Sequence, residues 1–330
     1  MKETLNRLIN HEQLSKTDAR TILVNIAKGD YNGSQIAAFL TVYMMRSITI
    51  EELEGFRDAL LDLCLAIDLA AYDPIDLCGT GGDGKDTFNI STLASFVTAG
   101  AGIKVTKHGN YGVSSTCGSS NVMEFLGIKF SSDADFLEKS IDQAGICVLH
   151  APLFHPAMKN VAPIRRELGV KTFFNMLGPM VNPAFPKNQM VGVFNLELAR
   201  MYGYLYQNTD KKFTVLHALD GYDEISLTGR TKTISNLSEG ILEPEDFGVK
   251  AISHTDIIGG NSIADSAKIF MEVLEGRGTE AQNNVVCANA GIAIATVKEI
   301  GAKEGFEMAM ESLRSGHGLR ALKKLQELSN

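Results

Sequence analysis

The sequence predicts an α/β protein with two parts: a small all-helical domain, and a large α/β domain whose central sheet is flanked by helices. Three observations support this prediction. Residues 1–71 show only helical periodicity, short apolar runs then alternate with helical stretches, and glycine-rich or polar segments directly follow several of those runs. A chain of 330 residues is long enough for a large domain with a smaller companion.

The helical domain is expected over residues 1–71, with a returning helical segment at about 154–186 that lacks strand signals. Helix starts are expected at Ser15, Ser34 and Thr49. Glu52 stands three residues after Thr49, which is the pattern of a capping box. Apolar residues recur at helical spacing in the second helix, so they form either the core or a subunit interface, and they are Ile36, Phe39, Leu40 and Tyr43.

The α/β domain is expected over residues 72–153 and 187–330. Five short apolar runs separated by helical periodicity predict its strands, at 75–78, 103–106, 146–150, 190–194 and 213–217. The alanine-rich tail, 281–330, predicts helices broken at Gly301 and Gly316 that pack on the sheet.

Charge and cysteine content narrow the possible partners and the compartment. A net charge of -8 and a pI near 5.4 argue against nucleic acid, which is held by clustered Lys and Arg. The five cysteines form no C-x-x-C pair, so neither a disulfide framework nor a zinc site is expected. The sequence contains no leader-like apolar segment and no apolar run of membrane-spanning length. We therefore expect a cytoplasmic protein without membrane or nucleic-acid partners.

The densest signal is the segment from Asp76 to Thr92, which places four glycines between a strand and a helix, at 79, 81, 82 and 84. Glycine permits positive φ, so successive N–H groups can converge on phosphate oxygens, and Ser91 and Thr92 add donors at a helix N-terminus. The segment predicts an anion cradle, with a tight turn as the alternative. It matches neither the P-loop nor the G-x-G-x-x-G pattern.

A second polar segment, residues 107–115, follows the predicted strand 103–106 and so lies at the carboxyl edge of the sheet. Lys107 could supply a point charge for a diphosphate. Hydrogen bonds to phosphates or ribose are expected from Asn110, Ser114, Ser115 and Ser119. His108 is either a ligand contact or an ordinary hydrogen-bonded residue.

Two further segments carry charge. Asp223 and Glu224 follow a strand and a glycine turn, and Mg²⁺ prefers one or two carboxylates together with waters and substrate phosphates. A solvated acidic turn is the alternative. Arg165 and Arg166 are neighbours on an expected helix, about 100° apart, so one of them is expected to grip a carboxylate while the other stays at the surface.

With these segments in view, the chain resembles the anthranilate phosphoribosyltransferases, within the nucleoside phosphorylase and phosphoribosyltransferase superfamily. The resemblance runs from end to end through G-T-G-G-D, F-N-I-S-T, K-H-G-N, H-P-A-M, R-R-E-L-G and D-G-x-D-E. It implies a nucleoside phosphorylase-like fold, a homodimer formed through the helical domain, and a role in tryptophan biosynthesis. The implied reaction transfers phosphoribose from phosphoribosyl diphosphate (PRPP) to the amine of anthranilate, without a protein nucleophile.

The resemblance also implies roles for individual residues. PRPP would be bound by Gly79, Gly82, Asp83, Thr87, Asn89, Ser91, Thr92, Lys107, His108, Gly109, Asn110, Ser114, Ser115 and Ser119. Two Mg²⁺ ions would be held by Ser91, Asp223 and Glu224, and anthranilate by Gly79, Asn110 and Arg165. The chain departs from the family pattern at Tyr111, where Arg is common, and at Ser120 and Asn121, where Ala-Asp is common.

Three alternatives remain open at this point. A pyrimidine nucleoside phosphorylase would share the architecture, but its K-H-S type of phosphate loop is absent. A noncatalytic relative that binds nucleic acid or a nucleotide is opposed by the acidic charge and the intact carboxylate pair. A phosphoribosyltransferase with another aromatic acceptor would differ only in the pocket around Arg165, His155 and Met158.

Overall fold

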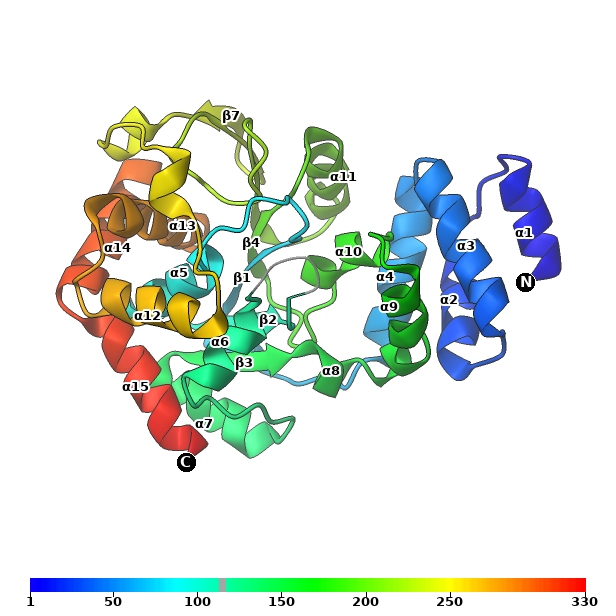
Figure 1. Ribbon diagram of the computed structural model, residues 1–330, viewed down its shortest axis with the longest axis horizontal. Coiled ribbons are helices and arrows are strands. Elements are labelled where there is room, and N and C mark those ends of the chain that lie inside the picture. Colours follow the sequence, from blue (N-terminus) through cyan, green and yellow to red (C-terminus); the bar gives the residue numbers. More distant parts are fainter. Residues whose placement is uncertain (113–116) are drawn as a thin grey trace. The chain divides into compact units, whose positions relative to one another are not determined.

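The computed structural model describes residues 1–112 and 117–330, which form two compact units (Figure 1). The helical unit contains residues 1–67 and 151–183, and the α/β unit contains residues 68–150 and 184–330. The chain therefore leaves the helical unit, enters the α/β unit and returns once before it completes the sheet.

The helical unit begins with four capped or amphipathic helices. Its α-helices are α1 (Lys2–Ile9), α2 (Lys16–Lys28), α3 (Gly33–Met45), α4 (Ile50–Leu63), α8 (Ala151–Phe154), α9 (Ala162–Leu168) and α10 (Phe174–Leu177), with 3-10 turns η2 (Pro156–Asn160) and η3 (Gly178–Met180). Ser15 caps α2, and Thr49 with Glu52 forms the predicted capping box of α4. The predicted start at Ser34 is wrong, because Asn32 and Gln35 form a capping box that begins α3 earlier.

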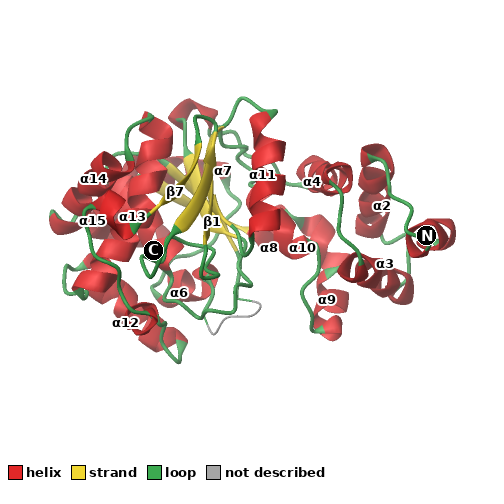
Figure 2. Cartoon of the chain, turned by 90° about the horizontal axis from the view of Figure 1, so that it is seen from above, coloured by secondary structure: helices red, strands yellow, loops and turns green. Residues whose placement is uncertain are grey.

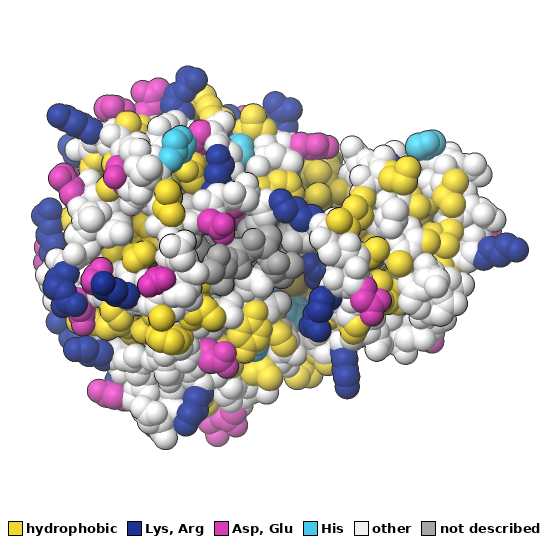
Figure 3. Space-filling model, in the orientation of Figure 1, with side chains coloured by type: hydrophobic (Ala, Val, Ile, Leu, Met, Phe, Trp, Pro, Cys, Tyr) yellow, Lys and Arg dark blue, Asp and Glu magenta, His cyan; other side chains and the backbone are white. Residues whose placement is uncertain are grey.

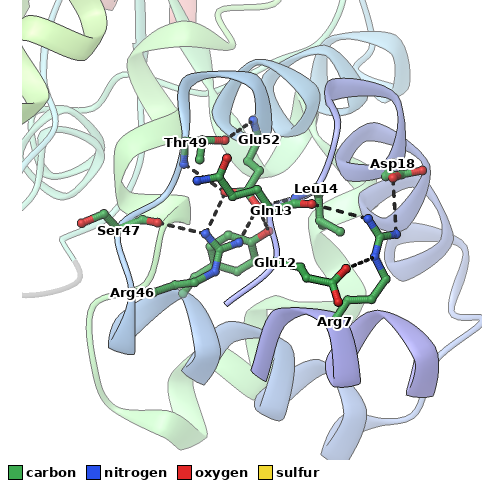
Figure 4. A network of polar contacts seen from close by, with 10 residues as sticks. Arg7, Glu12, Gln13, Leu14, Asp18, Arg46, Ser47, Thr49 and Glu52 are labelled. Atoms are coloured by element: carbon green, nitrogen blue, oxygen red, sulfur yellow. Dashed lines mark hydrogen bonds and ion pairs between the residues drawn. The ribbon is translucent and has the colours of Figure 1, made fainter. Parts of the chain in front are cut away.

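A buried carboxylate ties the first helices together (Figure 4). Glu52 is 0% exposed and accepts hydrogen bonds from the N–H groups of Leu14 (2.9 Å) and Thr49 (2.9 Å) and from the hydroxyl of Tyr43 (3.0 Å). The guanidinium of Arg46 pairs with it. Burial alone would raise the pKa of Glu52, but the hydrogen bonds from Arg46, Thr49 and Leu14 lower it. The pair is therefore held ionised, with both carboxylate oxygens of Glu52 hydrogen-bonded inside the unit.

The α/β unit is built on one seven-stranded sheet in the order β3-β2-β1-β4-β5-β6-β7. The strands are β1 (Ile75–Gly79), β2 (Val105–Gly109), β3 (Ile146–His150), β4 (Asn188–Gly192), β5 (Lys212–Ala218), β6 (Thr231–Ser235) and β7 (Glu239–Leu242). All pairs from β3 to β5 are parallel, and β6 and β7 add antiparallel strands at one edge. The five predicted strands are present, whereas β6 and β7 were not predicted.

Helices cover both faces of the sheet, as Figure 2 shows for α13 on one side and α11 on the other. The helices of this unit are α5 (Ile90–Gly100), α6 (Ser119–Phe125), α7 (Ala134–Ala144), α11 (Leu196–Gln207), α12 (Ile263–Leu274), α13 (Glu280–Lys298), α14 (Ala302–Arg314) and α15 (His317–Ser329), with 3-10 turns η1 (Ala70–Tyr72), η4 (Pro244–Phe247) and η5 (His254–Ile257). As predicted, the tail is helical and breaks at Gly301 and Gly316.

Helix hydropathy and surface charge bear on whether a membrane or a nucleic acid is a partner. In the part of the chain that is described, no single helix is long and apolar enough to cross a membrane, and only the bent pair α13 and α14 passes that test together. On the face of the α/β unit drawn in Figure 3, basic side chains are interspersed with acidic ones. A nucleic-acid partner would favour clustered basic side chains instead.

Candidate active site

The carboxyl ends of β1 and β4 meet where the strand order reverses, because β2 and β3 lie on one side of this pair and β5 on the other. Gly79 and Gly192 end these two strands and are paired in register. Open parallel sheets bind ligands in the crevice at such a point. The glycine-rich segment starts here, so the fold itself selects this edge as the candidate site.

Asp223 and Glu224 lie against the glycine-rich loop that follows β1. The N–H of Gly81 donates to Asp223 Oδ2 at 2.7 Å, and the N–H of Ser91 donates to Glu224 Oε1 at 3.0 Å. Glu224 Oε2 accepts a further bond from Thr87 Oγ1 at 3.1 Å. The structure thus brings together the glycine-rich segment and the carboxylate pair, which the family resemblance had grouped through Ser91.

Two glycines make this approach possible. An added Cβ on Gly79 would lie 2.3 Å from Asp223 Oδ2, and one on Gly192 would lie 1.5 Å from the backbone oxygen of Asp223. Neither position tolerates a side chain without displacement of the carboxylate turn. Gly79 was among the predicted site residues. Gly192 was not, because its constraint comes from a segment that follows later in the chain.

The glycine-rich loop has a backbone that suits an anion. Positive φ angles occur at Gly81 (65°), Gly82 (80°) and Gly84 (75°), where glycine carries no steric penalty. The end of the loop is fixed by a second segment, since Phe88 N–H donates to the Ile257 carbonyl (3.3 Å) and Gly259 N–H donates to the Asp86 carbonyl (2.8 Å). This support from residues 257–259 was not predicted from the sequence.

The N-terminus of α5 follows the loop and carries three of the predicted site residues. Asn89 precedes the helix, and its Nδ2 donates to the carbonyl of Cys117 at 2.9 Å. Ser91 is half-buried, whereas Thr92 is buried. The first turn of this helix therefore presents Ser91 beside Glu224, and the dipole of the helix favours negative charge at the same place.

Lys107 has a different setting from the one the sequence indicated. Its side chain is 2% exposed, and Nζ donates to the carbonyl of Leu77 at 2.8 Å. Burial lowers its pKa, against the raising effects of Cys78, Asp76 and Glu224. The ammonium thus bonds to the middle of β1, and direct contact of Lys107 with a diphosphate stays a prediction.

The other described residues of the second polar segment (107–115) form hydrogen bonds within the α/β unit. His108 is buried, and its backbone N–H donates a hydrogen bond to Asp76 Oδ1 at 3.3 Å. Ser119 Oγ donates to the carbonyl of Asn110 at 3.3 Å, and an added Cβ on Gly109 would lie 2.5 Å from that hydroxyl oxygen. Asn110 is exposed. The predicted residues Ser114 and Ser115 lie outside the described residues.

The two carboxylates concentrate negative charge in a buried place. Asp223 is 8% exposed and Glu224 is 7% exposed. Burial and the neighbouring charge of Asp83 raise the pKa of Asp223 to about 7, and burial and Asp223 raise the pKa of Glu224 well above its usual range. Within the described residues no three His, Cys, Asp or Glu side chains form a metal cage. A carboxylate pair of this kind suits Mg²⁺ completed by water and phosphate oxygens.

Asp223→Asn is expected to raise the melting temperature of the metal-free protein at pH 8 by about 3 °C. The pKa of Asp223 is about 7 in the folded protein, above the ordinary value that applies to the unfolded chain. An ionised carboxylate at this position therefore lowers the free energy of unfolding. That penalty develops as the pH rises from 3.8, the ordinary value, to about 7, so the gain of the variant should shrink towards pH 5. Thermal unfolding in EDTA at both pH values measures this, and an equal gain at pH 5 would contradict it.

The candidate carboxylate-binding arginine lies in the helical unit. Arg165 is half-buried on α9, its Nη2 donates to Asn175 Oδ1 at 3.3 Å, and its guanidinium lies 5.2 Å from the ring centre of Phe174. Burial lowers its pKa. Arg166 is exposed. The two neighbours therefore differ in the expected way, with Arg165 held in a fixed setting and Arg166 at the surface.

Comparison with known families assigns both units. Residues 71–319 match the family described as glycosyl transferase family, a/b domain, and residues 2–64 match its helical bundle domain. Among solved structures, the chain is similar to anthranilate phosphoribosyltransferase from Thermus thermophilus, with a TM-score of 0.92, 30% identity and 98% coverage of both chains. It is also similar to the Saccharomyces cerevisiae enzyme in complex with PRPP and Mg, with a TM-score of 0.90, 28% identity and coverage of 98% and 96%.

Curated relatives are more similar still. The chain is 76% identical over 329 residues to anthranilate phosphoribosyltransferase of Flavobacterium psychrophilum, with 100% of both chains covered. It is 73% identical to the enzyme of Flavobacterium johnsoniae over the same length and coverage. The chain therefore belongs to the anthranilate phosphoribosyltransferase family.

Proposed function

We propose that this protein transfers the phosphoribosyl group of PRPP to the amine of anthranilate and releases diphosphate. The observation that carries the proposal is the junction of the glycine-rich loop with Asp223 and Glu224 at the switch point of the sheet. This junction places the glycine-rich loop and the first turn of α5 beside two carboxylates that would hold a cation. The names of the relatives support this reading over a nucleoside phosphorylase.

PRPP is the proposed occupant of the loop and the N-terminus of α5. The donors proposed for it are the glycine backbone of residues 79–84, Thr87, Asn89, Ser91 and Thr92, with Asn110 and Ser119 from the neighbouring segment. Helix α5 directs its positive dipole end towards the same place. These groups would hold the diphosphate where its negative charge increases as it leaves.

Mg²⁺ is the proposed cofactor, held by Asp223, Glu224 and Ser91. The yeast relative was solved with PRPP and Mg, and we propose two ions per subunit because two buried carboxylates converge here. When bound, the metal would neutralise charge on the diphosphate. Asp223 and Glu224 are kept in place by Gly81, Ser91 and Thr87, and this fixed position supports their proposed role as metal ligands.

The reaction needs positioning more than acid–base chemistry. The anthranilate nitrogen forms a bond to C1 of ribose, the bond from C1 to the diphosphate oxygen breaks with its electron pair, and the nitrogen then loses a proton. An aromatic amine is already neutral at pH 7, so a protein nucleophile or a strong base is not required. The role of the site residues is to orient the substrates and to stabilise the leaving group.

Arg165→Gln is expected to raise KM for anthranilate about 30-fold while kcat changes little, because a charge-assisted bond to the substrate carboxylate is lost. Arg166→Gln is the matched control, since that side chain is exposed. Steady-state kinetics at saturating PRPP measures both variants. Equal effects at the two positions would argue against the assignment of Arg165.

The helical unit is also proposed to form a homodimer interface. Its support is the pair of exposed apolar side chains at the end of α3, where Met44 is 44% and Met45 is 82% exposed. Exposed apolar side chains of this kind favour an interface. Light scattering of the wild type and of Met45→Lys tests this proposal.

The direct test of the function is the loss of anthranilate fluorescence in purified protein with PRPP, with and without Mg²⁺. Metal-dependent loss supports the donor, the acceptor and the cofactor together. Release of diphosphate only with other aromatic amines would move the acceptor. No consumption of PRPP by folded protein would overturn the proposal.

A further inference from the structure

The three positions at which this chain departs from the family pattern lie in one set of contacts. They are Tyr111, Ser120 and Asn121, which border the proposed PRPP donors Asn110 and Ser119. Tyr111 follows β2, and the other two lie in the first turn of α6. All of these residues belong to the α/β unit.

The side chain of Asn121 links two backbone segments, one at Gly112 and one at Gly118. Its Oδ1 accepts hydrogen bonds from the N–H groups of Gly112 and Gly118, both at 3.0 Å. The two segments lie so close that an added Cβ on Gly118 would be 2.1 Å from the nitrogen of Gly112. A single side-chain oxygen therefore links Gly112 to Gly118.

The side chains of Tyr111 and Ser120 both contact the imidazole of His150, the last residue of β3. The Tyr111 ring meets the imidazole edge-on with centroids 4.8 Å apart, and Ser120 Oγ lies 2.9 Å from His150 Nδ1. Phe130 stacks on the same imidazole, with ring centroids 4.5 Å apart. The tyrosine hydroxyl also donates to the exposed carboxylate of Glu124 at 3.3 Å. Tyr111, next to Asn110, and Ser120, in the first turn of α6, thus contact the same imidazole.

The same backbone carries the proposed donors. The carbonyl of Asn110 accepts bonds from Ser120 N–H at 3.2 Å and from Ser119 Oγ at 3.3 Å. A shift of Gly112 relative to Gly118 would therefore move Asn110 and Ser119 apart. Misplaced donors weaken binding even when their chemistry is unchanged.

We propose that Asn121 is a positioning residue for PRPP, and that Tyr111, through His150, assists it. The inference rests on the proposed function, because it concerns how the PRPP donors are placed. Asn121 touches neither substrate in this proposal. It acts through the backbone of Gly112 and Gly118, which keeps Asn110 and Ser119 in register.

Three variants test the proposal. Asn121→Ala should raise KM for PRPP about tenfold and leave kcat within about twofold, because donors are displaced rather than removed. Asn121→Asp retains an oxygen acceptor for both N–H groups and should restore KM to within about threefold of the wild type. Thr279→Ala is the stability control, because it removes the capping bond of α13 and lies in no part of the site.

The outcomes separate positioning from stability. An unchanged KM for PRPP in Asn121→Ala, an equal rise in Thr279→Ala, or failure of Asn121→Asp to restore binding would overturn the inference. If Asn121→Ala does not fold, Tyr111→Ala serves in its place, since that side chain is 38% exposed, and it should raise KM for PRPP about threefold. A folded wild type that consumes no PRPP would overturn the proposed function as well, whereas an active wild type with unaffected variants would overturn this inference alone.

Discussion

Asp223→Asn combined with Glu224→Gln is expected to lower kcat with PRPP and anthranilate by about three orders of magnitude, while anthranilate affinity changes little. The amide oxygens still accept the hydrogen bonds from the N–H groups of Gly81 and Ser91, and the new amide nitrogen at 224 can donate to the Thr87 hydroxyl, so the loop should remain folded. What they lose is negative charge, and with it the capacity to hold Mg²⁺ on the leaving diphosphate. Single-turnover kinetics at saturating substrate measures the chemical step.

Asp246→Asn is the matched control for this double variant. Asp246 Oδ2 accepts the N–H of Glu243 at 2.8 Å at the start of η4, and the amide keeps that bond while it removes one carboxylate from the same unit. The control should retain wild-type turnover. If the double variant also turned over at the wild-type rate at low Mg²⁺, the carboxylates would not be the metal ligands.

The parallel part of the fold could be predicted because each of its strands overlaps a short, mostly apolar run. β1 and β3 are buried at nearly every residue, so they differ clearly from the helices around them. β6 and β7 lack this signal, since most of their residues are half-buried or exposed. They lie at the antiparallel edge, where the sequence Thr-Lys-Thr-Ile-Ser resembles a polar connection as much as a strand.

Lys107 illustrates how a small error in a strand boundary changes a chemical interpretation. The sequence placed the strand at 103–106, so that Lys107 began a loop at the carboxyl edge. In the structure β2 is Val105–Gly109, so Lys107 is an inner residue of the strand, and its side chain passes to the carbonyl of Leu77. The apolar run showed where a strand exists, whereas its register depends on pairing with β1 and β3.

The local sequence patterns indicated separate segments, and only the family resemblance grouped Ser91 with Asp223 and Glu224. The glycine-rich segment and the Asp-Glu pair each carry a chemical signature in the sequence. Their meeting depends on the order of the strands, which places β4 beside β1 and brings the turn at Asp223 over the pair Gly79 and Gly192. No local pattern marks Gly192, which lies in the middle of the apolar run 190–194.

Gly192→Ala is therefore expected to have a large effect at a position that the sequence did not indicate. Its Cβ would lie 1.5 Å from the backbone oxygen of Asp223, so either strand β4 or the carboxylate turn must shift. Overpacking of this kind costs about 3 kcal/mol of stability. Displacement of the carboxylates should also lower turnover about 100-fold and raise the Mg²⁺ concentration needed for half-maximal rate.

Gly240→Ala is the matched control for Gly192→Ala. Gly240 also lies in a strand of this sheet, and an added Cβ there meets nothing within 4 Å. The same substitution should therefore leave stability and turnover close to the wild type. Denaturant unfolding and the fluorescence assay measure both variants across Mg²⁺ concentrations. Equal behaviour of the two variants would mean that the carboxylate turn does not depend on close contact with β4, and the site would then have to be placed away from the switch point.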